Sequence, residues 1–170
     1  MDDRVSKTSR ASDILFRLAS DDADLPHLVD LAKSAHDESR FSYIPFCADK
    51  VCKIARKAFD DTSRHAVMLA IKHDAPVGFA YCSIGEYHIG QDVLITTIHN
   101  MNVSRSLRRS LSGGRVALGL FKGVETWSAA RGSREVLFHV TSGVDLARSH
   151  KLAKHIGYKF IGGSYAKGIG

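Results

Sequence analysis

A single mixed α/β (α+β) domain is predicted for this chain, and three features of the sequence predict it. The chain has 170 residues, which is enough for one domain with a substantial core. Hydrophobic residues make up 44% and charged residues 25%, the balance of an ordinary globular domain. Apolar runs alternate with segments of helical periodicity in the order β-α-α-β-β-β-α-β-α-β. We therefore expect a mixed central sheet with helices on both faces.

The first part of the chain predicts one strand followed by two helices. Residues 14–20 (ILFRLAS) form an apolar run typical of a strand. Residues 21–39 begin with acidic side chains, which favour the positive N-terminal end of a helix, and continue with an apolar stripe at helical spacing. Residues 48–61 have a second such stripe. The segment between the two helices, residues 40–46 (RFSYIPF), is an aromatic linker.

The middle of the chain predicts three consecutive strands. Residues 65–73 and 77–87 are apolar and rich in β-branched and aromatic side chains, and the short sequence DAP at 74–76 separates them. This arrangement is typical of a hairpin. Residues 92–103 (DVLITTIHNMNV) form a long third run of the same kind.

The last part of the chain predicts two more helix and strand pairs. A helical pattern from 114–131 ends before Gly132, where a C-terminal glycine cap is expected. Residues 135–141 are continuously apolar, as in a strand buried on both faces. A final helix at 145–158 and a closing strand at 159–169 complete the sheet.

The N-terminal residues and the cysteines indicate in which cellular compartment the protein is expected. Residues 1–13 have no apolar centre like that of a signal peptide, so we expect a flexible tail there, one domain at 14–170, and a cytoplasmic protein. No apolar run is long enough to span a membrane. Cys47, Cys52 and Cys82 are an odd number without a disulfide-framework spacing, which fits a reducing compartment. Their spacing also argues against a metal site.

The net charge of +6 at pH 7 favours an anionic partner. Nucleic acid, an acidic lipid surface and a polyphosphate cofactor all fit that charge. The arginines are concentrated around the segment SLSGGRVALGLF, residues 110–121, in which Gly113 and Gly114 lie at the expected start of a helix. Free N–H groups and a positive partial charge make a helix N-terminus suited to an anion, and glycines allow a close approach of the backbone.

On this element order and on two local patterns, the chain from about residue 14 to 168 resembles the GNAT superfamily of acetyl-CoA-dependent N-acetyltransferases. The first pattern is the acetyl-CoA loop, Q/R-x-x-G-x-G/A at the start of a helix. Two registers fit here: one begins at Ser112 and ends at Ala117, and the other begins at Arg109 and ends at Gly114. The first leaves the helix at its usual length and is preferred.

The second pattern is KLAKHIGYKFIGGSY, residues 151–165. It is similar to the passage from the last helix to the following strand in the family. Gly157 and Tyr158 stand where the family has Gly-Phe. Ala153 stands where many members have the tyrosine that is assigned as general acid, so the resemblance leaves the acid open.

The resemblance implies an N-acetyltransferase that moves an acetyl group from acetyl-CoA to a primary amine by direct attack in a ternary complex. The backbone of a splayed strand would bind the thioester and the pantetheine arm, and the helix start with its arginines would bind the phosphates. The expected cofactor-binding residues are Met101, Asn102, Val103, Arg108, Arg109, Ser112, Gly113, Gly114, Arg115, Val116 and Ala117.

Three residues are candidates for proton transfer. Strand alternation predicts that His99 shares a face with Thr97, Met101 and Val103, and an imidazole with a pKa of ~6.5 suits a base near neutral pH. Glu86 on the neighbouring strand is the second candidate base. Tyr165 is the candidate substitute for the missing acid.

Three aromatic side chains of the linker would line the acceptor site, as the resemblance implies: Phe41, Tyr43 and Phe46.

Two other functions remain open from the sequence. A non-catalytic acyl-CoA-binding protein of this fold would explain the missing tyrosine. A basic nucleic-acid-binding module would explain the charge, although the run SRSLRRSLSGGR at 104–115 lacks the aromatic side chains on which bases stack. A membrane partner is not expected, the amine acceptor is not identified by the sequence, and a homodimer is compatible with the resemblance.

Overall fold

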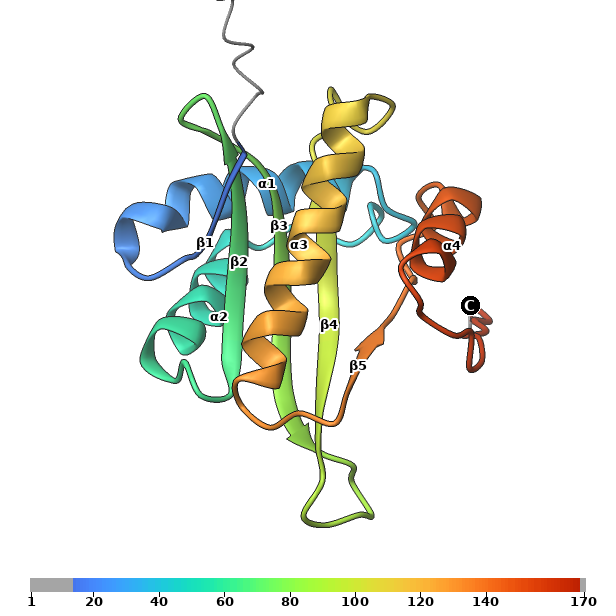
Figure 1. Ribbon diagram of the computed structural model, residues 1–170. Coiled ribbons are helices and arrows are strands. Elements are labelled where there is room, and N and C mark those ends of the chain that lie inside the picture. The colour runs from blue at the N-terminus through green and yellow to red at the C-terminus, as the bar shows by residue number, and fades with distance from the viewer. Residues whose placement is uncertain (1–13, 169–170) are drawn as a thin grey trace, which may run out of the picture.

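The computed structural model describes residues 14–168, and the tail expected at residues 1–13 lies outside the described residues. Its centre is a five-stranded sheet with the strand order β1-β2-β3-β4-β5 (Figure 1). Strands β1 to β4 are antiparallel neighbours, and β5 runs parallel to β4. The strands are β1 (Ile14–Leu18), β2 (His65–Lys72), β3 (Ala75–Glu86), β4 (Leu94–Val103) and β5 (Glu135–Phe138). The mixed central sheet is confirmed.

Helices cover both faces of the sheet, as predicted. Helix α3 packs on one face, and helices α1 and α2 pack on the other. The helices are α1 (Leu25–Asp37), α2 (Ala48–Asp60), α3 (Leu111–Ala129) and α4 (Leu146–His155), with a short 3-10 helix η1 (Asp22–Asp24) before α1. None of the helices within residues 14–168 has the length and apolar character needed to cross a bilayer.

Helix α3 begins three residues earlier than its predicted start at Gly114, because Ser110 caps it. The Ser110 backbone is extended, and its hydroxyl oxygen accepts a hydrogen bond from the Gly113 N–H at 3.1 Å. Serine is among the best N-cap residues, and the two glycines lie inside the helix instead of at its start. The earlier start places Leu111, Ser112 and Gly113 in the first turn.

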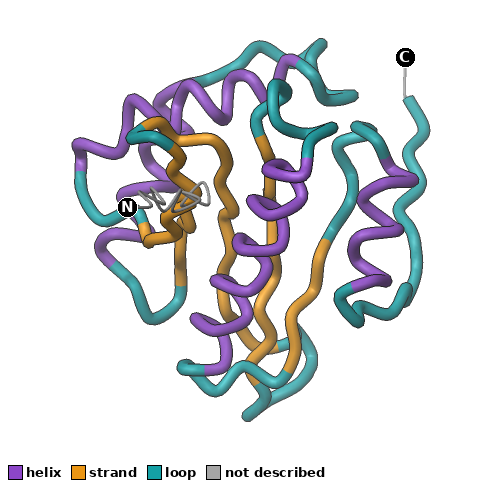
Figure 2. Tube along the Cα trace, turned by 45° about the horizontal axis from the view of Figure 1, so that its top comes forward, coloured by secondary structure: helices purple, strands orange, loops and turns teal. Residues whose placement is uncertain are grey.

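The closing strand predicted at 159–169 was wrong for its described part. Residues 159–168 form no strand, and the side chains of Phe160, Ile161 and Tyr165 are almost fully exposed. Gly157 has a φ of 95°, which turns the chain after α4, and Gly162 with Gly163 offers no side chain that could pack on a sheet. Figure 2 shows α4 and this segment beyond β5.

Candidate functional site

Strands β4 and β5 separate half-way along β4 and leave a gap between them. They pair only from Ile95 with Glu135 to Ile98 with Phe138, whereas β4 continues to Val103. From His99 onward, the edge of β4 that faces β5 therefore has no strand partner within the described chain.

The direction of the backbone identifies which groups face this gap. The Ser104 N–H donates to the carbonyl of Val77 in β3 at 2.8 Å. Because successive residues of a strand direct their backbone groups to opposite edges, the N–H groups of Met101 and Val103 point into the gap. A Cβ placed on Gly78 of β3 would lie 2.9 Å from the Asn102 carbonyl oxygen, so the Asn102 backbone faces β3 instead.

His99 lies on the face covered by α1 and α2, at a β-bulge in β4. Tyr81 pairs with Asn100 and Cys82 pairs with Ile98, so His99 has no direct partner on β3. Such an extra residue changes which face the following side chains occupy. Met101 and Val103 consequently pack on the α3 side. The prediction that they share a face with His99 was wrong, because period-two alternation cannot anticipate a bulge.

The imidazole of His99 is held by two neighbours from β3. Its Nε2 lies 2.7 Å from the Ser83 hydroxyl oxygen, and its ring stacks on Tyr81 with 5.1 Å between centroids. Burial lowers the pKa of His99 below its ordinary value of 6.5, and repulsion by His139 and His65 lowers it further. The residue is still open to solvent, so a neutral imidazole is accessible at neutral pH.

The other candidates for proton transfer lie apart from His99. Glu86 ends β3, and its carboxylate accepts a hydrogen bond from the Asp92 N–H at 3.2 Å. Glu86 comes four residues after Cys82, the β3 residue that pairs beside the bulge. At the usual rise of a strand, these four residues span about 13 Å. Tyr165 is fully exposed in the segment after α4.

One further tyrosine and one cysteine close to the sheet are poor proton donors. The Tyr158 hydroxyl is buried without a hydrogen-bond partner in residues 14–168. Burial, and then the nearby carboxylate of Glu125, raises the pKa of Tyr158. Burial also raises the pKa of the Cys82 thiol to about 12, so this thiol is not a ready nucleophile.

The two glycines at the start of α3 are not equivalent. A Cβ on Gly113 would lie 2.0 Å from the Leu107 carbonyl oxygen, whereas a Cβ on Gly114 would meet nothing within 4 Å. Gly113 therefore allows the loop between β4 and α3 to fold closely onto the helix. Val116 and Ala117 are buried in the second turn, where N–H groups bond to carbonyls one turn back. In the first turn, the Gly113 N–H donates to the Ser110 hydroxyl and the Gly114 N–H to the Ser110 carbonyl at 3.2 Å, so the N–H groups of Leu111 and Ser112 are the ones without a partner in residues 14–168.

The arginines predicted to bind phosphate divide into two groups. Arg108 is held by other parts of the protein: Nε donates to the Val103 carbonyl at 2.7 Å, Nη2 donates to Asn102 Oδ1 at 2.7 Å, and Nη1 pairs with the Glu38 carboxylate. Arg109 and Arg115 are exposed and form no ion pair with any residue between 14 and 168.

A further basic residue near α3 was missed in the sequence. Lys72, the last residue of β2, donates from Nζ to the Ser112 hydroxyl at 3.1 Å. This places its charge at the N-terminal turn of α3. Forty residues separate the two side chains, and no local pattern indicates such a contact. Lys72, Arg109 and Arg115 give the start of α3 a concentrated positive charge.

The segment between α1 and α2 connects the two sides of the gap. It begins at Glu38, whose carboxylate pairs with Arg108 near β4, and the Arg40 N–H donates to the Ser142 carbonyl after β5 at 2.7 Å. Its predicted substrate-binding aromatics are Phe41 and Phe46, both partly buried, and Tyr43, which is 79% exposed. Figure 1 shows this segment reaching from α1 toward α4.

Solved structures share this arrangement of strands and helices. No protein-family model and no curated protein matches the sequence. Aminoglycoside N-acetyltransferase AAC(6')-Iy in complex with CoA is 18% identical, with a TM-score of 0.73 over 95% of this chain and 97% of that chain. This chain has the GNAT acetyltransferase fold. The predicted fold resemblance is therefore confirmed.

Two further structures show how far the fold extends. AAC(6')-Iy with a bisubstrate analogue of CoA and acetylneamine is 18% identical, with a TM-score of 0.70 over 93% of this chain and 100% of that chain. A protein described as a transcriptional regulator from Bacillus halodurans C-125 is 13% identical, with a TM-score of 0.68 over 92% of this chain and 100% of that chain. At these identities the GNAT fold is shared, and activity is argued from the site.

Proposed function

We propose that this protein is an N-acetyltransferase that moves an acetyl group from acetyl-CoA to a primary amine by direct attack in a ternary complex. The observation that carries the proposal is the open edge of β4, with two N–H groups directed into the gap and His99 on the adjoining bulge. The neighbour AAC(6')-Iy, which is described in complex with CoA and with a CoA bisubstrate analogue, supports the choice of cofactor.

The residues present fit an extended, polyanionic cofactor. The N–H groups of Leu111 and Ser112, which start α3, suit a pyrophosphate. Lys72, Arg109 and Arg115 supply charge around that turn. The N–H groups of Met101 and Val103 suit the amide and thioester groups of the pantetheine arm. The acetyl thioester supplies the activated acyl group.

His99 is the group that we propose to take the proton from the amine. Its lowered pKa keeps the imidazole neutral and able to accept a proton at neutral pH. A proton on Nε2 shared with Ser83 leaves Nδ1 as the basic nitrogen. Met101 N–H, a rigid main-chain donor at the gap, polarises the carbonyl that the amine attacks. The backbone alone sets the direction of this N–H, so no particular side chain is needed at position 101.

Calorimetric titration of acetyl-CoA into the purified protein tests the proposed cofactor site. We expect saturable binding to one site, because the gap and the α3 N-terminus are continuous through the loop at 104–110. A short DNA duplex serves as the control and is expected to release no heat. Absence of acetyl-CoA binding contradicts the proposal, and DNA binding in its place supports a nucleic-acid-binding module.

Replacing His99 with glutamine separates catalysis from binding. We expect turnover with a panel of primary amines to fall about a hundredfold, the usual contribution of a general base, while the affinity for acetyl-CoA is unchanged. The matched control is His88→Gln in the β3–β4 loop, outside the site. Activity of the unchanged protein should rise with pH up to an inflection below 6.5, since the pKa of His99 is lowered.

The outcomes of these assays, with the variant and with the unchanged protein, discriminate between the open alternatives. A variant that binds acetyl-CoA normally and has lost turnover identifies an enzyme with His99 as its base. If the unchanged protein binds acetyl-CoA but acetylates no amine in the panel, a non-catalytic acyl-CoA-binding role is favoured. Full activity in His99→Gln contradicts the role proposed for His99.

A further inference from the structure

The Arg108 side chain joins the end of β4 to the residue that follows α1. Nε and Nη2 donate to the Val103 carbonyl and to Asn102 Oδ1, both at the end of β4 and each at 2.7 Å. Nη1 forms an ion pair with Glu38, 70 residues away. Both side chains of this pair are only 21% exposed, so the pair is better shielded from water than an ordinary surface pair.

The backbone of Arg108 is also fixed. Its carbonyl accepts a hydrogen bond from Arg148 Nη1 of α4 at 2.7 Å, and the Ser110 N–H donates to the neighbouring Leu107 carbonyl at 2.9 Å. An arginine whose planar guanidinium and backbone are both held has little rotamer freedom left. A displacement of the end of β4 is therefore passed on to the partner of the guanidinium.

Glu38, the partner of the Arg108 guanidinium, is the first residue of the segment that contains the aromatic side chains of the proposed acceptor site. Glu38 directly follows α1. The hydroxyl of the next residue, Ser39, donates to the His36 carbonyl at 2.8 Å, and the Phe41 N–H donates to the Ser39 hydroxyl at 3.1 Å. These contacts join the residue after Glu38 to the end of α1 and to Phe41, in the linker that continues to Tyr43. The position of Glu38 thus influences where the linker aromatics lie.

We infer that the Arg108–Glu38 pair couples the cofactor side of the gap to the segment at 38–47, so that binding of acetyl-CoA orders that segment for the amine. The inference rests on the proposed function. A ligand bonded to the gap-facing N–H groups restricts the end of β4, and Arg108 joins that end to Glu38. Arg108 is then a positioning residue, in place of the phosphate ligand that the sequence predicted.

Hydrogen exchange in the linker, with and without acetyl-CoA, tests the coupling. We expect acetyl-CoA to slow exchange at 39–46 by about fivefold, at the low end of typical coupling between sites. Glu38→Gln and Arg108→Lys should remove most of this protection, because the first breaks the ion pair and the second loses the Nε bond to Val103. Because the coupling between cofactor binding and linker order is reciprocal, Glu38→Gln should also bind acetyl-CoA about fivefold more weakly, as measured by calorimetry.

Asp37→Asn is the matched control, since Asp37 loses the same charge one residue away. Its carboxylate pairs with Lys33 of its own helix, so the ligand-induced protection should remain. Full protection in both Glu38→Gln and Arg108→Lys, with acetyl-CoA bound, overturns the coupling and leaves the proposed function intact. Equal loss in Asp37→Asn also overturns it. Absence of acetyl-CoA binding in the unchanged protein overturns both.

Discussion

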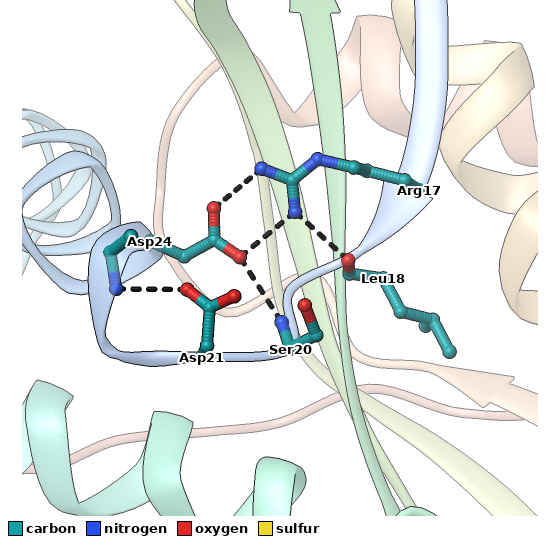
Figure 3. A network of polar contacts seen from close by, with 6 residues as sticks. Arg17, Leu18, Ser20, Asp21 and Asp24 are labelled. Carbon is teal, nitrogen blue, oxygen red and sulfur yellow. Dashed lines mark hydrogen bonds and ion pairs between the residues drawn. The ribbon is translucent and has the colours of Figure 1, made fainter.

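Replacing Asp24 with alanine is expected to lower the free energy of unfolding by about 3 kcal/mol. The Asp24 carboxylate is nearly buried and accepts hydrogen bonds from both terminal nitrogens of Arg17, at 2.5 and 2.8 Å, and from the Ser20 N–H at 3.1 Å (Figure 3). Alanine would leave Arg17 Nη2 and the Ser20 N–H without this partner, while Arg17 Nη1 would keep only its bond to the Leu18 carbonyl at 3.0 Å. Because the Arg17 side chain is 38% exposed, the loss is placed at the low end for a buried ion pair.

The pH dependence of this stabilisation has a definite sign. The hydrogen bond from Arg17 holds the pKa of Asp24 below its ordinary value of 3.8. A carboxyl group with a lower pKa in the folded state stabilises the protein above the unfolded pKa, and this contribution disappears as the pH falls through the folded pKa. The difference between the unchanged protein and Asp24→Ala should therefore be full at neutral pH and shrink below about pH 4.

Urea unfolding followed by circular dichroism at neutral and acidic pH measures both expectations. Asp22→Ala is the control, because the pair that Asp22 forms with Arg56 at 2.9 Å is exposed on both sides and exposed pairs contribute little. A similar destabilisation in both variants, or a difference that grows on acidification, would contradict the role assigned to Asp24.

Features that depend on local periodicity could be predicted from the sequence. The stripe of Val116, Leu120, Val124 and Trp127 was expected on one face of α3, and all four are buried against the sheet. Such a stripe is repeated every turn of the helix, so one shifted boundary does not change which side chains face inward. The same reasoning predicted the order of the elements from β1 to α4 and both helical layers, but not the end of the chain.

The site depends on features that leave no local signal. The bulge at His99 is one extra residue relative to β3, and only the register between two strands reveals it. The contacts of Lys72 with Ser112 and of Arg108 with Glu38 join residues 40 and 70 positions apart. The sequence could propose which residue types bind phosphate, but it could not tell that Arg108 is bound by the protein itself.

The error at the C-terminus has a related physical cause. Phe160 and Ile161 lie in a short apolar run, which favours a strand when it is considered alone. A strand also needs a partner edge, and the chain after α4 extends beyond β5 instead of along it. Propensity for β-structure depends on packing against neighbouring strands, and a single sequence does not show where those neighbours lie.

The largest effect on cofactor binding is expected from replacing Gly113 with alanine. The new Cβ would lie 2.0 Å from the Leu107 carbonyl oxygen and 3.1 Å from the Arg108 Cα. Both are backbone atoms, so the loop between β4 and α3 must move away from the helix. Since misplacement of a binding group by about 1 Å can cost a hundredfold, we expect acetyl-CoA affinity to fall by about that factor. The strain should also lower the free energy of unfolding by about 1–3 kcal/mol.

Gly114→Ala is the matched control, with the same change one residue further along α3. A Cβ there meets nothing within 4 Å, and alanine in place of glycine stabilises a helix by about 1 kcal/mol. In acetyl-CoA titration, Gly114→Ala should therefore bind as the unchanged protein does, and in urea unfolding it should be more stable, whereas Gly113→Ala should lose both affinity and stability. If both variants bind acetyl-CoA as the unchanged protein does, the loop around Leu107 takes no part in binding. The open edge of β4 would then have to hold the cofactor without the positive end of α3.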